Sequence, residues 1–204
     1  MPGYAGQKNM GELYMRDQMV TTCLEKRFGH DPRLVFTVPL PDREPVFMKL
    51  NISEGGQDNC GVVIVDAAKF LALWRADPTE LHKAEANGSP ETWPSDYKYK
   101  DADDGFAPGR ENPVPLAEVN LNHHIDTITS YKFWRFGKTV RKQRLDCIAF
   151  TNGITRTIWL LSHHCAAFPV QCDLNSAPEL FKLAGAAGTS FHTIAEWAEL
   201  AQPA

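Results

Sequence analysis

Residues 146–161, DCIAFTNGITRTIWLL, decide the fold of this chain. The run from Asp146 to Phe150 is apolar after its first residue, which is typical of a buried strand. Turn-forming residues follow as far as Gly153, and apolar side chains then recur at helical spacing up to Leu161. The stretch therefore predicts a strand, a glycine turn and a helix in direct succession.

Further strands are predicted on both sides of this stretch. They are indicated by β-branched and apolar runs at Arg33 to Val38, Val46 to Ile52, Gly61 to Val65, Val114 to Val119 and Phe168 to Cys172. Asp66 stands at the position of a helix N-cap directly after the third run, so a helix is expected over residues 67–76. Pro78 ends that helix by restricting the backbone of the residue before it.

An N-terminal helix is predicted ahead of the first strand. Asn9 followed by Glu12 resembles an N-cap with its returning acid. Apolar side chains at helical spacing extend this pattern to Phe28, and Gly29 then ends it.

Two short helices are predicted near the C-terminus. Each follows a pattern typical of a capping box, Ser176 with Glu179 and Thr193 with Glu196. The whole order of elements predicts an α+β fold, a mixed β-sheet flanked by helices, in a single domain over residues 1–204.

The segment 78–113 is rich in Pro, Asp, Gly and Asn and has little periodicity, so we expect a long surface loop there. Its aromatic residues Trp93, Tyr97 and Tyr99 indicate partial docking on the body of the protein. A plain mobile insertion is the alternative reading.

Composition limits the classes of protein that the chain can belong to. Its 204 residues are 43% hydrophobic and 23% charged, with a net charge of −4, which excludes collagen, a coiled coil, wholesale disorder and a strongly basic nucleic-acid coat. Five cysteines without a C-x-x-C pair argue against a disulfide framework and favour a reducing cytoplasm. We expect no membrane insertion, because no run approaches the roughly 20 apolar residues of a membrane span.

The glycine turn is a candidate phosphate site. A helix that begins directly after a strand presents free N–H groups and the positive end of its dipole at one point. Asn152, Gly153 and Thr155 surround that point, and the Arg156 guanidinium can hold phosphate through two hydrogen bonds. The alternative is that Gly153 only makes the turn and that Arg156 is solvated.

The run Ala149 to Leu161, followed by Phe168-Pro169-Val170, resembles the signature of the ParB/sulfiredoxin fold superfamily. Val114 to Val119 is similar to the opening strand of those domains, so the resemblance implies a core segment over residues 114–185. In that superfamily, a strand, a Gly-x-[His/Arg]-Arg turn, a helix and a further strand build a nucleotide or phosphate pocket.

More narrowly, the pattern from about Gly61 to Gly185 resembles the plasmid fertility inhibition factor family, which includes the FipA and FiwA proteins. The pieces that carry the resemblance are Val62 to Asp66 with Leu73-Trp74, Thr151 to Thr157, and the segment from Leu160 to Val170. The resemblance implies a bacterial cytoplasmic protein that blocks conjugative transfer of a co-resident plasmid. The partner that it implies is the coupling protein of the type IV secretion system, a hexameric ATPase.

Two departures from the superfamily favour a protein that is not an enzyme. Ile154 stands where sulfiredoxin carries its reactive cysteine, and Thr155 replaces the usual His or Arg of the turn. The glycine and Arg156 are retained. The resemblance thus implies an inherited pocket without inherited catalysis.

A second candidate surface lies between Tyr131 and Arg144, where six basic residues and no acid are interleaved with aromatic residues. The candidate partner-binding residues are Lys132, Trp134, Arg135, Lys138, Arg141, Lys142 and Arg144. Such a surface can bind an acidic protein or single-stranded nucleic acid. Because the net charge of −4 opposes tight binding to nucleic acid, a protein partner is the better hypothesis of the two. The remaining alternative is an amphipathic segment whose aromatic residues belong to the core and whose charges are solvated. The loop acids Asp96, Asp101, Asp103 and Asp104 could neutralise part of it.

Metal binding and cofactors are not expected. Adjacent histidines point in different directions, so a metal would take only one from each of the pairs His123-His124 and His163-His164. The rival to a non-enzymatic inhibitor is a nuclease or ATPase in which Arg156 holds phosphate and Glu118 or Asp126 supplies a metal ligand or base. A carboxylate beside Arg156 in the folded chain would favour this enzyme.

Overall fold

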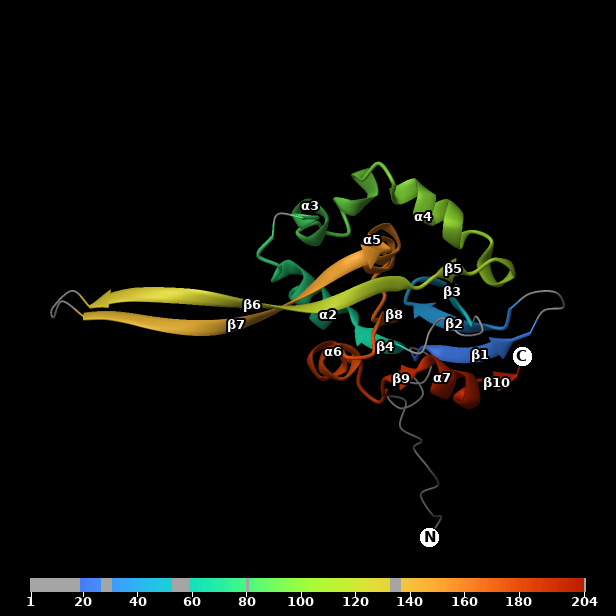
Figure 1. Ribbon diagram of the computed structural model, residues 1–204. Coiled ribbons are helices and arrows are strands. Elements are labelled where there is room, and N and C mark those ends of the chain that lie inside the picture. Colours follow the sequence, from blue (N-terminus) through green and yellow to red (C-terminus); the bar gives the residue numbers. More distant parts are fainter. Residues whose placement is uncertain (1–18, 27–30, 53–58, 80, 133–136, 204) are drawn as a thin grey trace, which may run out of the picture.

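The computed structural model describes residues 19–26, 31–52, 59–79, 81–132 and 137–203. It contains two five-stranded mixed sheets with helices packed around them (Figure 1). The predicted α+β class, a mixed β-sheet flanked by helices, is therefore confirmed. In the described ranges, no helix is both long enough and apolar enough to cross a bilayer.

The first sheet has the strand order β10-β1-β2-β3-β5. Its strands are β1 (Thr21–Glu25), β2 (Arg33–Leu40), β3 (Arg43–Asn51), β5 (Val114–Pro115) and β10 (Gln202–Pro203). The strands β1, β2 and β3 are antiparallel neighbours, whereas β5 and β10 pair in parallel at the two edges. The predicted strands at residues 33–38 and 46–52 correspond to β2 and β3.

The second sheet has the order β7-β6-β8-β4-β9, and residues 146–152 lie in its strand β7. Its strands are β4 (Cys60–Asp66), β6 (Ala117–Lys132), β7 (Gly137–Asn152), β8 (Ala167–Asp173) and β9 (His192–Thr193). The two long strands β6 and β7 are antiparallel, and β6 pairs in parallel with β8.

Helices and short 3-10 turns connect these strands. They are α2 (Ala67–Arg75), α3 (Lys83–Ala86), η1 (Trp93–Ser95), α4 (Tyr99–Phe106), η2 (Gly109–Glu111), α5 (Ile154–Ser162), α6 (Ala177–Ala184) and α7 (Ile194–Leu200). In Figure 1, α3, α4 and α5 lie above the strands of the body, and α6 and α7 lie below them. The strand, turn and helix predicted for residues 146–161 are the end of β7, the turn at Gly153 and α5.

The predicted N-terminal helix is wrong over residues 21–25, which form β1; its earlier part, residues 1–18, lies outside the described residues. A strand forms here in place of a helix because Thr21 and Thr22 are β-branched and because β2 and β10 offer backbone partners on both of its edges. Pairing between distant segments therefore overrides a helical pattern of apolar residues.

The segment 78–113 differs from the loop expected there, because it contains α3, η1, α4 and η2. Trp93 and Phe106 are buried, and the Phe106 ring stacks on Trp159 of α5 with centroids 4.3 Å apart. Tyr99 hydrogen-bonds to Ser162, while Tyr97 stays 83% exposed. The segment packs on α5 through Phe106 and Tyr99.

The predicted helix caps have mixed outcomes. Asp66 accepts a hydrogen bond from the Lys69 backbone N–H at 3.0 Å, which confirms it as the N-cap of α2. Thr193 and Glu196 form the predicted capping box of α7. Ser176 makes no side-chain cap, because its backbone is already helical rather than extended.

One contiguous hydrophobic core joins both sheets. Phe70 of α2 makes edge-to-face contacts with Phe150 of β7 and Phe168 of β8, at centroid distances of 5.8 and 5.3 Å. Phe36 of β2 contacts Trp197 of α7 in the same way at 5.5 Å. These aromatic contacts hold α2 and α7 against the sheets.

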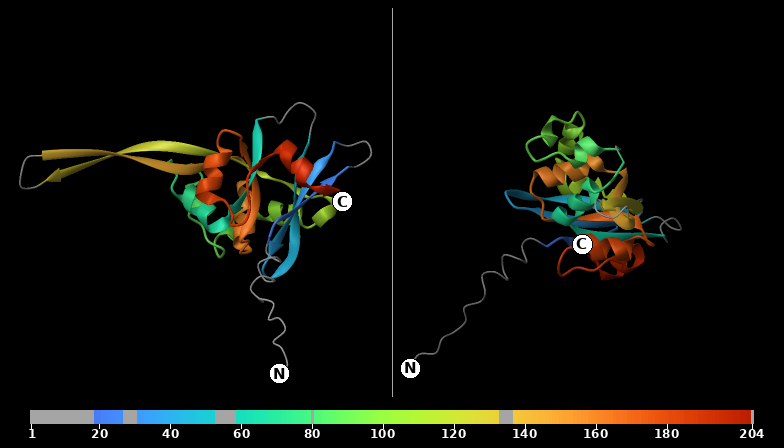
Figure 2. Two further views of the ribbon diagram at one scale, coloured as in Figure 1. Left: turned by 90° about the horizontal axis from the view of Figure 1, so that it is seen from below. Right: turned by 90° about the vertical axis from the view of Figure 1, so that its left-hand side faces the viewer.

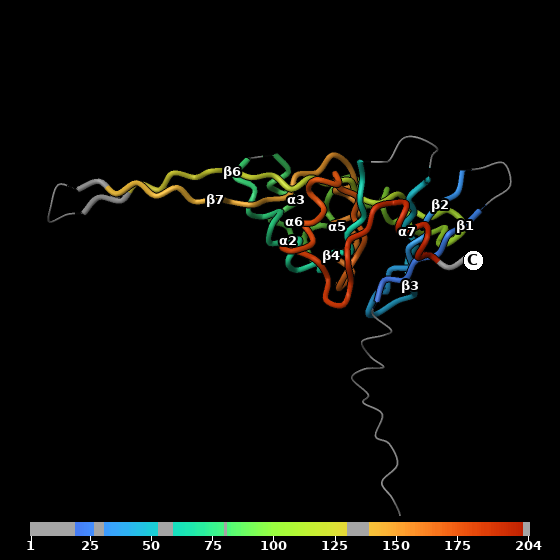
Figure 3. The backbone as a smooth tube through the Cα atoms, turned by 60° about the horizontal axis from the view of Figure 1, so that its bottom comes forward, coloured from blue at the N-terminus to red at the C-terminus, as the bar shows by residue number. Residues whose placement is uncertain are grey.

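A two-stranded arm extends from the second sheet. Beyond Val119, β6 pairs only with β7, so residues 120–132 and 137–149 form this arm. Figures 2 and 3 show it projecting from the body at the end opposite the strands β1, β2 and β3. The base of the arm is buried at Leu121 and Cys147, and its outer part is solvent-exposed.

Candidate functional site

Gly153 makes the turn between β7 and α5 with a φ of +95°, in the left-handed region. A Cβ atom at this position would lie 2.7 Å from the Ala117 Cα atom and 2.8 Å from its Cβ atom. The Gly153 carbonyl accepts hydrogen bonds from both the N–H and the hydroxyl of Thr157. Glycine is thus required by both the backbone conformation and the close approach of β6.

Arg156, in the first turn of α5, points back toward the start of β6. Its Nη2 atom donates a hydrogen bond to the Leu116 carbonyl at 3.2 Å, and its Nε atom is buried without a hydrogen-bond partner. Burial lowers the pKa of the Arg156 guanidinium, and the nearby Glu118 carboxylate acts in the opposite direction. The guanidinium stays charged, because an arginine in a protein is not deprotonated.

A cavity of about 390 Å³ lies beside this guanidinium. It is lined by Lys49 of β3, Asp101 of α4, Asn112 ahead of β5, and Thr155 and Arg156 of α5, together with Ala102, Gly105, Pro113, Val114 and Pro115. The Lys49 ammonium donates a hydrogen bond to the Asn112 side-chain oxygen at 3.2 Å. Two cations and one carboxylate therefore meet in one hollow, a combination suited to a phosphate-bearing ligand.

The structure divides the predicted phosphate-site residues. Thr155 and Arg156 line the cavity, and Gly153 shapes the turn behind it. Asn152 is exposed at the end of β7 and does not line the cavity. The phosphate site therefore stays a prediction, and of its four residues only Thr155 and Arg156 could contact a ligand in the cavity.

The carboxylates that the sequence offers for phosphate chemistry lie in different places. Glu118 lies close enough to Arg156 to oppose the lowering of its pKa by burial, but it lines a second cavity of about 190 Å³. Asp126 is exposed on the arm. The carboxylate that lines the cavity of Arg156 is Asp101, which belongs to the segment predicted as a surface loop. No local sequence signal marks Asp101 or Lys49, because the fold brings them to Arg156 from distant segments.

The buried thiols of Cys165, after α5, and of Cys172, on β8, are poor nucleophiles. Burial raises the pKa of Cys165 and of Cys172 to about 12, so both are neutral thiols. No cysteine lines the cavity beside Arg156.

The candidate partner surface lies on the arm. Trp134 and Arg135 lie outside the described residues, as do the side chains of Lys132 and Lys138. Two more members, Arg141 and Lys142, are exposed and form no ion pair with any described residue. These two residues lie opposite Ile128 and Thr127 in the antiparallel register.

Arg144 has a different role at the base of the arm. Its Nε atom lies 2.6 Å from the Asp146 carboxylate, and its Nη2 atom contacts His123 and Glu179. Hydrogen bonds from Arg144 and His123 lower the pKa of Asp146, although partial burial acts in the opposite direction. The Arg144 charge is therefore paired within the chain and joins the arm to α6.

The outer arm also exposes apolar side chains. Ile125 is 70% exposed, Val140 51% and Ile128 46%. A mixture of exposed apolar and cationic side chains is typical of a surface that binds another macromolecule.

The loop acids make contacts away from the arm. Asp103 accepts a hydrogen bond from the Trp159 indole at 3.2 Å, Asp96 accepts one from the Lys98 backbone, and Asp101 lines the cavity. Of the four acids that could neutralise the basic segment, these three have other positions: Asp101 and Asp103 lie on α4, and Asp96 follows η1.

Comparison with known proteins identifies the family. A family model described as "Plasmid Fertility inhibition factor" matches residues 62–185, which is more than half of the chain and runs from β4 past α6. The chain belongs to this family. The matched part includes the glycine turn, Arg156 and the whole arm, so the family expected from the sequence is confirmed.

Relatives of the fertility inhibition factor are similar over most of its length. "Protein osa" of Shigella flexneri is 31% identical over 137 residues, which are 67% of this chain and 60% of that protein. The chain therefore matches less than two thirds of that relative. A crystal structure described as the Oncogenic Suppression Activity Protein, a plasmid fertility inhibition factor, has a TM-score of 0.63 and 25% identity, covering 94% of this chain and 89% of that one.

Proposed function

We propose that this fertility inhibition factor acts in the cytoplasm and blocks conjugative transfer of a co-resident plasmid by binding the coupling protein of the type IV secretion system. The observation that carries the proposal is membership in the fertility inhibition family, together with an exposed arm that has no partner within the described chain. The mechanism is occlusion, in which the bound factor covers a surface that the coupling protein needs for delivery of DNA.

The arm suits binding to a protein in two ways. Arg141 and Lys142 supply positive charge for an acidic surface, and Ile125, Ile128 and Val140 supply apolar contact area. In addition, β7 is the outer strand of its sheet, and over the arm β6 pairs with no strand except β7. Both edges of the arm therefore offer backbone groups that can extend a sheet of the partner.

The test is capture of the partner during conjugation. Affinity-tagged full-length protein is purified from donor cells that carry a conjugative plasmid, and the coupling protein is identified by mass spectrometry. We expect the coupling protein to co-purify, and the number of transconjugants per donor to fall when the factor is expressed. Capture from cells without the conjugative plasmid is the control.

Two results would contradict the proposal. One is inhibition of transfer without capture of the coupling protein, even after chemical cross-linking in intact donor cells. The other is direct binding of the purified factor to the transferred DNA with an affinity high enough to account for inhibition.

A second candidate function is a phosphate-chemistry enzyme, a nuclease or ATPase acting on the transferred DNA. One specific observation favours it: the Asp101 carboxylate lines the same cavity as Arg156 and Lys49. A carboxylate beside bound phosphate can bind a divalent cation or accept a proton from an attacking water. The cationic side chains would then hold the phosphate oxygens.

Arg156→Ala separates the two candidates. If occlusion by the arm is the function, the variant inhibits transfer as well as the wild-type protein does. If the cavity is catalytic, phosphate release from ATP or nicking of supercoiled DNA, measured with and without Mg²⁺, falls by about 10²-fold or more. Inhibition that disappears together with such an activity would favour the enzyme.

A further inference from the structure

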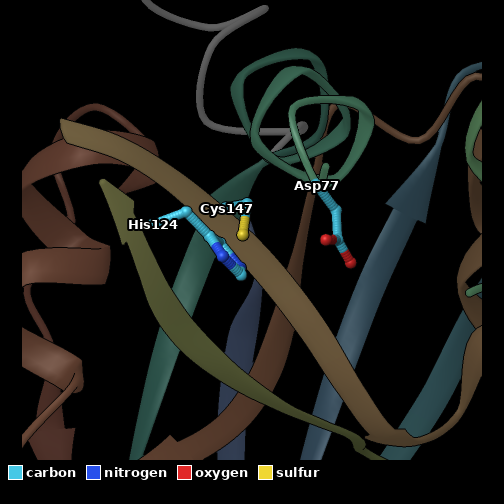
Figure 4. Close-up of side chains that lie close together, drawn as sticks. All are labelled: Asp77, His124 and Cys147. Carbon is cyan, nitrogen blue, oxygen red and sulfur yellow. The ribbon is translucent and has the colours of Figure 1, made fainter. Parts of the chain in front are cut away.

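Three potential metal ligands meet where the arm leaves the body. Asp77 follows the C-terminal end of α2, His124 lies on β6 and Cys147 lies on β7. A carboxylate oxygen, an imidazole nitrogen and the thiol sulfur all lie within 4.8 Å of one another. Figure 4 shows the His124 ring beside the Cys147 sulfur, with the Asp77 side chain extending from the loop after α2 toward the same region.

The register of the hairpin explains why the two strand residues meet. Cys147 lies directly opposite Asn122, two residues from His124, so both side chains project from the same face of the arm. The neighbouring His123 projects from the other face, toward Asp146 and Glu179. The two adjacent histidines thus have separate environments.

Asp77 is held close to this pair by local structure. Its N–H donates a hydrogen bond to the Trp74 carbonyl at 3.1 Å, and its carboxylate accepts one from the Thr79 backbone N–H at 2.9 Å. The carboxylate therefore lies near the negative end of the α2 dipole, which opposes its charge. A cation at this position would stabilise both the carboxylate and the helix end.

The three side chains are not bonded to one another. No hydrogen bond or ion pair links Asp77, His124 and Cys147 within the described part of the chain. Cys147 is fully buried; burial raises the pKa of its thiol, and the Asp77 and Asp146 carboxylates add to this effect. The region therefore gathers three donor atoms together with the negative charge of the Asp77 and Asp146 carboxylates.

A second cluster of potential metal ligands lies on the opposite face of the arm. His123, Asp146 and Glu179 also bring three potential ligands within 4.8 Å. There, however, the Arg144 guanidinium contacts all three side chains. That cluster already holds a cation of the chain itself, so a metal ion has no place in it.

We propose that Asp77, His124 and Cys147 bind one divalent transition-metal cation, Zn²⁺ in preference to other ions. Nitrogen, sulfur and oxygen donors together are the ligand types that Zn²⁺ takes, at about 2.0–2.3 Å from the metal. Tetrahedral ligands at those lengths are separated from one another by roughly 3.3–3.7 Å. A small inward movement of side chains that lie within 4.8 Å reaches this geometry.

The bound ion would join three elements of the fold. It would tie the loop after α2 to both strands of the arm, with a fourth position open to water. Binding replaces the proton of the Cys147 thiol by the metal and releases that proton to the solvent. The site departs from the sequence-based expectation of no metal, and it uses only one histidine of the pair.

The test measures metal binding by full-length protein that has been treated with a chelator and dialysed. Zn²⁺ binding is followed by calorimetry, and Co²⁺ binding by its absorption spectrum. We expect one Zn²⁺ per chain, a higher thermal midpoint with the metal bound, and the ultraviolet charge-transfer band that reports a bond between cobalt and a thiolate. Cys147→Ser is expected to remove that band.

Variants assign the ligands. His124→Ala and Asp77→Asn are expected to weaken Zn²⁺ binding by more than the roughly 10–100-fold that loss of an outer hydrogen-bond partner costs. His123→Ala is the matched control, because it removes the adjacent imidazole from the opposite face, and it should leave the affinity unchanged. Both variants should fold, because His123 is exposed and His124 is only partly buried.

Three results would overturn the proposal. They are absence of Zn²⁺ and Co²⁺ binding, a cobalt spectrum without a thiolate band, and an equal loss of affinity in His123→Ala and His124→Ala. The site stands independently of the proposed function, because metal binding is measured on the purified protein without a conjugation assay.

Discussion

Gly153→Val is expected to destabilise the fold by about 2–5 kcal/mol and to lower the yield of folded protein sharply. Two physical costs add at this position. A side chain in the left-handed region costs about 1–2 kcal/mol, and forcing atoms into a packed contact costs about 1–3 kcal/mol more. The contact is with backbone, since a Cβ atom would lie 2.7 Å from the Ala117 Cα atom.

Chemical denaturation measures this effect, and Gly188→Val is its matched control. Gly188 also has a left-handed φ, +76°, but the nearest atom to an added Cβ is 4.0 Å away at the end of the Met19 side chain. The control should therefore show only the conformational cost. Equal losses in the two variants would mean that the approach of β6 to the turn is not tight.

The strand, turn and helix at the centre of the fold could be predicted because their signals are local. The glycine turn lies between a buried apolar run and a helical repeat, and no distant segment competes with that pattern. Asp66 could be recognised as an N-cap for the same reason, since its partner is the backbone of Lys69.

Prediction failed where distant backbone pairing decides the structure. Residues 21–25 carry part of a helical pattern, yet they are held as a strand between β2 and β10, and β10 lies at the far end of the chain. A single sequence gives no sign of this pairing. The 16-residue strands β6 and β7 were also missed as a hairpin, because the arm has no apolar face along its whole length.

The candidate sites show the same division. Thr155 and Arg156 could be proposed from the turn, whereas Lys49 and Asp101 reach the cavity from β3 and α4. The cluster of Asp77, His124 and Cys147 joins three segments whose residues carry no spacing typical of a metal site. Sites of this kind become visible only when the register of the strands is known.

Charge reversal on the arm, Arg141→Glu with Lys142→Glu, is expected to abolish inhibition of plasmid transfer. Like charges placed against an acidic partner cost several kcal/mol, so the affinity for the coupling protein should fall by about 100-fold or more. Stability should change by less than about 0.5 kcal/mol for each substitution, because both side chains are exposed and form no ion pair in the described chain. Transconjugants per donor and the thermal midpoint are the measurements.

Lys100→Glu with Lys182→Glu is the matched control, since it makes the same change in net charge at exposed positions on helices α4 and α6 of the body. We expect this control to inhibit transfer fully. A folded arm variant that also inhibits fully would show that the arm is not the partner surface.

If the ligand were DNA, gel-shift titrations of the arm variant at two salt concentrations would show weaker binding with a smaller salt dependence than the wild-type protein has, because each lost phosphate contact reduces the number of counterions released. The inhibitory contact lies on Arg141 and Lys142 if the arm variant no longer binds the coupling protein and neither the variant nor the wild-type protein binds DNA.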